Sequence, residues 1–242
     1  MNLIVDVGNT FVKFAVFQND ELIHKVSFKL SKFKKEFKKL KRDFPKLKTA
    51  IISSVGRLSK KEIEIVKEEL EVLELNHKIK LPFKNLYKTP KTLGVDRIAL
   101  VSASVNQFPD NNVLIIDAGT CITYDFVNEK NEYLGGAISP GIRLRYHALH
   151  NLTANLPLLD KNQPESIIGN STESSIHSGV VMGVVKEIDG VIDQYKAEHQ
   201  DLTVILTGGD ANFLSNQLKN SIFANSNFLL EGLNYILDFN SK

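Results

Sequence analysis

The stretch "MNLIVDVGNTFVKFAVF" (residues 1–17) decides how the chain is interpreted. An apolar run stops at an acid, Asp6, a turn containing Gly8 follows, and a second apolar run begins at Val12. Two apolar runs around a glycine turn predict a β-hairpin. An acid beside such a turn is either a common turn residue or part of a ligand site.

The same arrangement returns half a chain later in "VLIIDAGTCITYDFV" (residues 113–127). Asp117 and Gly119 each stand 111 positions after Asp6 and Gly8, and a strand-like run again follows the turn. A repeat of this length is too long for a stacked solenoid. It indicates two similar halves.

The duplication changes the interpretation of the turn. One copy alone would favour a simple hairpin, whereas two matching copies favour a shared site. Backbone amides at a tight turn attract anions, and Thr10 and Thr120 add hydroxyl donors. Carboxylates tolerate neighbouring phosphates only when cations lie between them, as Mg²⁺ does. The pair of turns therefore predicts a site for a nucleotide polyphosphate.

The rest of the chain alternates between strand and helix patterns, which indicates the α/β class. We expect a third strand at 21–28, a buried strand ending near 53–54, a helix over 30–44, a helix that starts with the capping box of Ser59 and Glu62, a helix from about Asp96, and a long helix within 171–198. A polar cluster at 109–112 marks the expected domain boundary.

Composition narrows the class of protein. The chain has 242 residues, 43% of them apolar, and its net charge of +2 is too small to indicate a nucleic-acid partner. A single cysteine, Cys121, excludes an intramolecular disulfide, and we expect it to be a small buried side chain. No signal-peptide pattern or bilayer-length apolar run is seen, so we expect a cytoplasmic protein without a membrane partner.

One basic stretch needs its own interpretation. Residues 29–48 contain ten Lys or Arg residues against two acids, Glu36 and Asp43. Aromatic residues recur there at helical intervals. This spacing favours a helix with an apolar stripe that faces the core and a basic face that is exposed to solvent. Binding of nucleic acid or an anionic membrane is the less favoured alternative.

Six motifs in a fixed order, DVGNT, LGVDR, DAGT, GGAISPG, TANLP and LTGGD, resemble the type III pantothenate kinases. These kinases belong to the superfamily of acetate kinase, sugar kinases and actin. The resemblance runs from Asp6 to about Asp210, although residues 20–80 carry none of its motifs. It implies duplicated ribonuclease H-like (actin-like ATPase) domains, with mixed sheets flanked by helices, over residues 1–112 and 113–242.

The resemblance also implies an activity. Its members phosphorylate pantothenate to 4'-phosphopantothenate with ATP, the first step of coenzyme A biosynthesis. They are homodimers and use Mg²⁺ with a monovalent cation, K⁺ or NH₄⁺. Two alternatives remain open: another small-molecule kinase of the superfamily, or a non-catalytic nucleotide-binding regulator.

Matching the motifs position by position shows which residues of this chain the resemblance implies for the nucleotide site. The implied ATP-binding residues are Asp6, Val7, Gly8, Asn9, Thr10, Phe11, Val12 and Lys13 in the first hairpin, and Thr120 in the second. Asp6 is the implied Mg²⁺ ligand, directly or through water, and Asp117 the monovalent-cation ligand. Residues 207–210 match a glycine turn on the adenosine side.

The acceptor site is carried over in the same way. The implied pantothenate-binding residues are Tyr87, Gly94, Val95, Asp96, Arg97 and, from the partner subunit, Thr172, with Asp96 accepting the hydroxyl proton.

Several of these residues also have structural interpretations. Asp96 and Thr172 could each cap a helix. Arg97 could form a surface ion pair, although the carboxylate of pantothenate favours a cationic contact. Gly179 and Gly183 lie four apart and suit either a dimer seam or a close helix crossing within the chain.

Overall fold

The computed structural model describes residues 1–8, 10–54 and 58–241, so Asn9 of the first hairpin lies outside the described residues. The chain forms two compact units, Met1–Pro109 with Asn227–Lys242, and Asp110–Ser226. The first break lies beside the polar cluster at 109–112, and residues 227–242 group with the first unit and not with the second half. None of the helices in the described ranges is long and apolar enough to cross a membrane.

The first unit is built on a five-stranded sheet of order β3-β2-β1-β4-β5. Its strands are β1 (Asn2–Val7), β2 (Val12–Gln18), β3 (Glu21–Phe28), β4 (Thr49–Ser54) and β5 (Glu71–Glu74). The first three strands form an antiparallel meander, while β4 and β5 continue the sheet in parallel with β1. The same unit contains the short elements η1 (Leu30–Lys32), β6 (Lys84–Asn85) and η2 (Pro90–Thr92).

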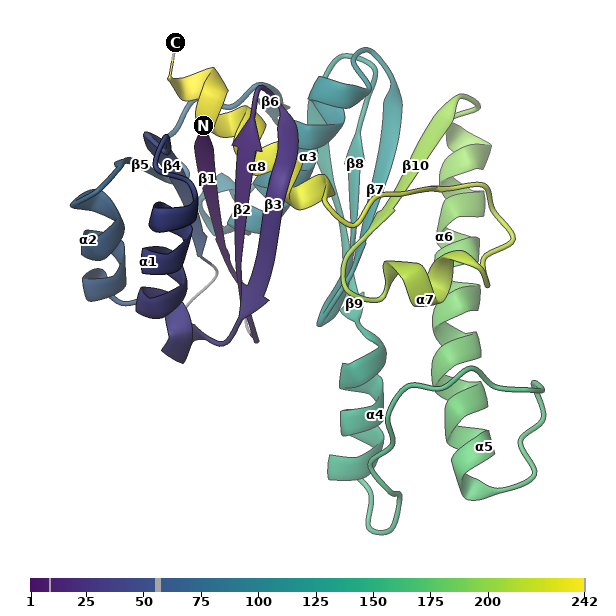
Figure 1. Ribbon diagram of the computed structural model, residues 1–242. Coiled ribbons are helices and arrows are strands. Elements are labelled where there is room, and N and C mark those ends of the chain that lie inside the picture. Colours follow the sequence, from purple (N-terminus) through teal and green to yellow (C-terminus); the bar gives the residue numbers. More distant parts are fainter. Residues whose placement is uncertain (9, 55–57, 242) are drawn as a thin grey trace. The chain divides into compact units, whose positions relative to one another are not determined.

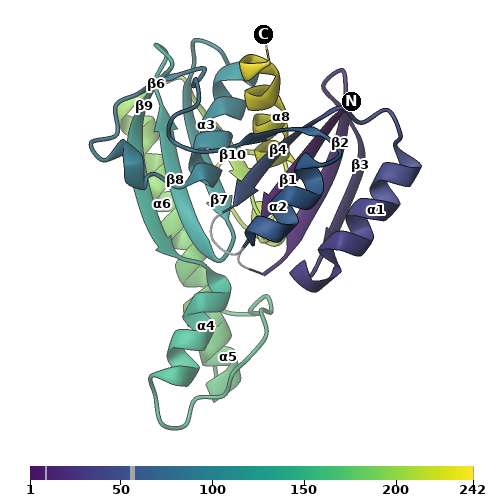
Figure 2. The same cartoon turned by 90° about the vertical axis from the view of Figure 1, so that its left-hand side faces the viewer.

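Helices cover both faces of this sheet (Figures 1 and 2). α1 (Phe33–Asp43) and α2 (Lys60–Lys67) lie on one face, and α3 (Val95–Gln107) and α8 (Phe228–Asn240) on the other. Phe33, Phe37 and Leu40 of α1 are buried, and the Phe33 ring centroid lies 5.1 Å from that of Phe14 in β2. The basic stretch therefore has the core-facing stripe that the sequence predicted.

The C-terminal helix joins the first unit through close packing of α8 on α3. A Cβ atom on Gly232 would lie only 1.9 Å from the carbonyl oxygen of Ala99. The backbones can approach this closely only because position 232 has no side chain. This contact explains why residues 227–242 do not belong to the second unit.

The second unit has its own mixed sheet, in which the strands run in the order β11-β10-β7-β8-β9. Its strands are β7 (Asn112–Ala118), β8 (Cys121–Val127), β9 (Glu132–Pro140), β10 (Leu202–Thr207) and β11 (Phe223–Ala224). Its helices are α4 (Ile142–Asn151), α5 (Thr172–His177), the π-helical η3 (Ser178–Met182), α6 (Gly183–Glu198) and α7 (Ala211–Ser215).

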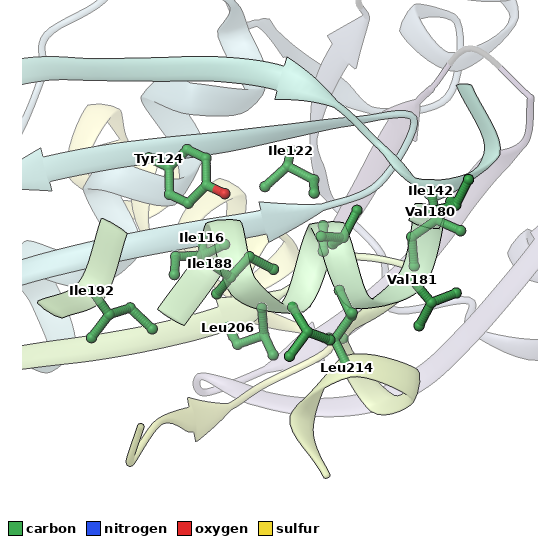
Figure 3. Packing of buried hydrophobic residues seen from close by; sticks show 14 of the residues in the cluster. Ile116, Ile122, Tyr124, Ile142, Val180, Val181, Ile188, Ile192, Leu206 and Leu214 are labelled. Carbon is green, nitrogen blue, oxygen red and sulfur yellow. The ribbon is translucent and has the colours of Figure 1, made fainter. Parts of the chain in front are cut away.

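The predicted long helix is present as α5, η3 and α6, which follow one another without a break. Its apolar side packs on the sheet, where Ile188 and Ile192 lie against Ile116, Tyr124 and other residues of one buried cluster (Figure 3). The wider π turn in the middle is a feature that apolar spacing alone does not reveal.

The internal repeat is present in the topology as well as in the sequence. β1 pairs antiparallel with β2 and parallel with β4, and β7 pairs antiparallel with β8 and parallel with β10. Asp6 thus stands between Lys13 and Ser53, and Asp117 takes the corresponding place near the end of β7. Each unit therefore places its acid on a central strand, just before a hairpin turn.

The α3–α8 contact leads to a stability prediction. Gly232→Ala should lower the free energy of unfolding by about 1–3 kcal/mol, because its Cβ meets backbone that cannot move aside. Gly190→Ala in α6 is the matched control, since its Cβ would meet nothing within 4 Å among the described residues. It should instead stabilise the protein by roughly 1 kcal/mol through helix propensity. Thermal melts that shift in the same direction for both variants would contradict the close contact.

Candidate functional site

The first hairpin holds a buried carboxylate. Gly8 N donates to Phe11 O at 3.1 Å across the turn, and Nζ of Lys13 lies 3.2 Å from Oδ2 of Asp6 on the neighbouring strand. Asp6 is 8% exposed, and this burial raises its pKa, although Lys13 acts in the opposite direction. Lys13 is half exposed and turns toward the acid.

The other residues of the first hairpin differ in what they offer a ligand. Thr10 and Phe11 are exposed at the turn. Val7 and Val12 are buried in the core, so only their backbone atoms could contact a nucleotide.

Asp96 lies at the start of α3, where a carboxylate is stabilised by the helix dipole. Gly94, not Asp96, is the N-cap residue, so the expectation that Asp96 could cap this helix is wrong. Oδ1 of Asp96 accepts a hydrogen bond from Arg97 N at 2.9 Å and lies so close to Gly94 that a Cβ there would be 2.3 Å away. The negative charge of Asp96 adds to the rise in the pKa of Asp6. The first unit thus places the two carboxylates close enough for their charges to repel each other.

Arg97, which is buried, and Tyr87, which is half-buried, form a cation–aromatic pair beside this acid. The guanidinium carbon of Arg97 lies 5.6 Å from the centroid of the Tyr87 ring. Arg97 is only 5% exposed, which excludes the surface ion pair considered from the sequence. A buried guanidinium on an aromatic face is suited to hold an anionic group in a fixed plane.

The second hairpin has a more open environment. Gly119 N donates to Cys121 O at 2.9 Å across the turn, Asp117 is half-buried and Thr120 is exposed. Cys121 is exposed, so the expectation of a buried thiol is wrong; the residue begins β8 directly after the turn, where its side chain reaches solvent.

Residues 207–210, which the motif assigned to the adenosine side, lie next to this second hairpin. Asp210 N donates to Ala118 O at 2.9 Å, and Oδ1 of Asp117 lies against Gly208. The glycine turn and the end of β7 are therefore in direct contact.

Thr172 lies in a different part of the second unit. It is the first residue of α5, capped by Ser171 rather than by itself, and it lines a groove of about 1110 Å³ beside Ala148 and Leu149 of α4. The hairpin instead contacts Gly141 at the start of α4, roughly 6 Å along the helix axis from Arg145, the groove residue nearest to it on that helix. The second unit therefore keeps Thr172 apart from the hairpin.

Gly179 and Gly183 do not mediate a close helix crossing. A Cβ on either residue would meet no atom within 4 Å in the part of the chain that the structure describes. The interpretation as a crossing within the chain therefore has no support here.

One cluster was not predicted from the sequence. Arg145 on α4 donates to Pro140 O at 2.9 Å, to Oγ of Ser139 at 3.0 Å and to Glu187 on α6. The hydroxyl of Tyr124 donates to the same Glu187 at 2.9 Å. Burial tends to raise the pKa of Glu187, but the bonds from Arg145, Ser139 and Tyr124 together lower it. No sequence spacing signals this cluster, because Arg145 and Glu187 are 42 positions apart.

A metal ion would have few protein ligands in either unit. Among the described residues, no three or more His, Cys, Asp or Glu side chains are grouped to hold a metal. Each hairpin instead offers a single carboxylate, Asp6 or Asp117. A single carboxylate suits a cation that takes its other ligands from phosphate and water.

Solved structures with similar folds support the architecture. A Campylobacter jejuni protein of the Baf family aligns with a TM-score of 0.66 and 21% identity, over 99% of this chain and 98% of that one. A glucokinase from an Antarctic psychrotroph aligns with a TM-score of 0.53 and 12% identity, over 98% of both chains. At these identities the likeness concerns the fold alone.

Sequence comparison is more specific. A protein from Christiangramia forsetii named type III pantothenate kinase is 54% identical over 240 residues, which are 99% of each chain. One of the same name from Flavobacterium johnsoniae is 52% identical over 233 residues, 96% of each chain. The family model described as type III pantothenate kinase matches residues 2–194. The motif resemblance is thereby confirmed, and the chain belongs to the type III pantothenate kinase family.

Proposed function

We propose that this kinase transfers the γ-phosphoryl group of ATP to the primary hydroxyl of pantothenate in the cytoplasm, with Asp96 as general base. The product would be 4'-phosphopantothenate, the first intermediate toward coenzyme A. The observation that carries the proposal is the grouping of Asp96 with the buried Arg97 and the Tyr87 ring that packs on it. An acid, a cation and an aromatic ring together suit an anionic acceptor that carries a hydroxyl group.

Arg97 is assigned to the carboxylate of pantothenate. A guanidinium forms two parallel hydrogen bonds with a carboxylate, and this pairing is stronger where water is excluded. The Tyr87 ring packs on the guanidinium and restricts its plane. Gly94 and Val95 form the backbone beside the same acceptor.

Asp96 is assigned to the acceptor hydroxyl. Its Oδ1 is held by Arg97 N, and Oδ2 is the atom that would take the proton as the oxygen attacks phosphorus. Phosphoryl transfer has a loose transition state, so positioning and charge neutralisation contribute most of the rate. A general base contributes typically about 10²–10⁴-fold.

The two hairpins are assigned to the nucleotide. Thr10, Lys13 and Thr120 would donate to phosphate oxygens, together with the turn amides. Mg²⁺, when bound, would neutralise phosphate charge. Asp6 fits such a cation because its buried charge is otherwise costly, as its raised pKa indicates. We assign a monovalent cation, K⁺ or NH₄⁺, to Asp117.

We propose a homodimer in which the groove around Thr172 faces a second copy. The surroundings of this groove expose apolar side chains that are costly in water, with Ile167 68% and Ile168 79% exposed. Gly179 lines the groove and leaves room for close approach. Thr172 would then complete the acceptor site of the partner.

Asp96→Asn tests the proposed base. Turnover of pantothenate should fall by about 10²–10⁴-fold, because the amide cannot accept the hydroxyl proton. The melting temperature should stay close to that of the wild type, and the exposed Asp201→Asn should retain full activity as the control. Turnover within threefold of the wild type would remove Asp96 from the chemistry.

Asp6→Asn should change activity and stability in opposite directions. The folded state holds the proton of Asp6 more tightly than the unfolded chain does, so the ionised carboxylate lowers stability at pH 7. The neutral amide should therefore raise the melting temperature at pH 7 while turnover falls more than about tenfold. The stability gain should vanish below the ordinary titration range of aspartate, where both states are protonated. A lower melting temperature at pH 7 would show that the ion pair with Lys13 outweighs the cost of burial.

Subunit mixing tests whether Thr172 acts across the dimer. Asp96→Asn and Thr172→Val chains, each impaired alone, should regain about a quarter of wild-type activity when equal amounts are unfolded and refolded together. Half of the dimers would then be mixed, and each would contain one intact site. Activity that only equals the average of the two variants would place Thr172 in its own subunit's site or outside the reaction.

A further inference from the structure

We infer that Arg145 is a positioning residue that holds the second hairpin in place for the phosphates of ATP. The inference rests on the proposed function, because it assigns a role in nucleotide binding to a side chain that is not expected to touch the nucleotide. It concerns the second unit alone.

Arg145, on α4, is hydrogen-bonded through its guanidinium group to two other segments. Nε donates to Pro140 O at 2.9 Å, and Nη2 donates to Oγ of Ser139 at 3.0 Å and to Oε2 of Glu187. Ser139 and Pro140 end β9, whereas Glu187 lies on α6. The end of β9 is thereby fixed to a helix that packs on the sheet.

This end of β9 is in direct contact with the hairpin. Pro140 stands opposite Cys121 in the strand register, immediately after the turn. The next residue, Gly141, donates its N–H to Thr120 O at 3.0 Å. A Cβ on Gly141 would lie 2.2 Å from Gly119 O, so the two backbones touch. Any shift of residues 139–141 would therefore move the turn that carries Thr120.

The guanidinium group is suited to this task. Its planar fork reaches a backbone carbonyl, a hydroxyl and a carboxylate at the same time, which an ammonium group on a flexible stem does less well. The Tyr124 hydroxyl donates to the other oxygen of Glu187 and fixes the carboxylate from the sheet. The side chains of Arg145 and Glu187 are only 21% and 27% exposed, so solvent weakens the pair less than it would a surface ion pair.

Packing alone does not provide this connection. Ile142 at the start of α4 and Val180 belong to the same apolar cluster of the second unit (Figure 3). That packing anchors the helix, but it makes no hydrogen bond to the strand end. Loss of Arg145 should therefore loosen residues 139–141 more than it destabilises the whole unit.

Steady-state kinetics and nucleotide binding test the inference. Arg145→Ala should raise the KM for ATP, and the Kd for Mg-ATP measured by calorimetry without pantothenate, by about tenfold. Arg145 also lines the groove around Thr172, so the KM for pantothenate should rise as well, but less than the KM for ATP. Glu187→Gln should shift ATP binding in the same direction, and Arg145→Lys should restore part of it. Arg143→Ala is the matched control: Arg143 lies on the same helix and contacts His147, and ATP binding should not change.

A KM and Kd for ATP within twofold of the wild type in Arg145→Ala would overturn the inference, even if the melting temperature falls. If that variant does not fold, Arg145→Lys and Glu187→Gln decide by the same readout. A wild-type protein that binds Mg-ATP but leaves pantothenate unchanged would contradict the proposed function and not this inference. A wild-type protein that binds no Mg-ATP would overturn both.

Discussion

The burial of an acid at the end of a central strand is the constraint on which the site depends. Asp6 stands where β1 has neighbours on both sides, and burial makes its charge costly. Lys13 on the facing strand offsets part of this cost. A buried acid at this position does not stabilise the folded protein, so its presence is best explained by a ligand that binds to it. The proposed nucleotide with its cation would be that ligand.

The two units share one strand topology but carry different side chains near the hairpin turn. In both, a central strand pairs antiparallel with its hairpin partner and parallel with a later strand, and an acid precedes the turn. The first acid is buried beside a lysine, whereas the second is half-buried beside a glycine turn. Asp96 and Arg97, which we assign to the acceptor, belong to the first unit. The two units thus share the same strand pairing but differ in the side chains near the turn. Such a difference suits a reaction whose two substrates differ in charge and shape.

Local patterns in the sequence predicted much of this structure. The hairpins, the stripe of Phe33, Phe37 and Leu40, and the start of α3 near Asp96 follow from apolar spacing and turn residues. The grouping of Tyr87 with Arg97 came from motif resemblance, and the structure places the two side chains together.

Features set by contacts between distant segments could not be predicted. The packing of α8 on α3 depends on Gly232 meeting Ala99, and no local pattern signals it. The bonds of Arg145 to Glu187 likewise join two helices that are separate in the sequence. Ser171 and Thr172 are adjacent residues that both cap helices well, so the sequence could not decide between them.

The most direct test of the central claim compares two acceptors under one condition. The wild-type protein is incubated with ATP, Mg²⁺ and K⁺ and either pantothenate or its alcohol analogue, in which a hydroxymethyl group replaces the carboxylate. Phosphorylated product is then measured by ³¹P NMR. The account predicts a phosphomonoester on the primary hydroxyl of pantothenate and a much slower reaction of the analogue, because Arg97 would have no carboxylate to bind. No phosphorylated pantothenate, or equal rates for both acceptors, would contradict it.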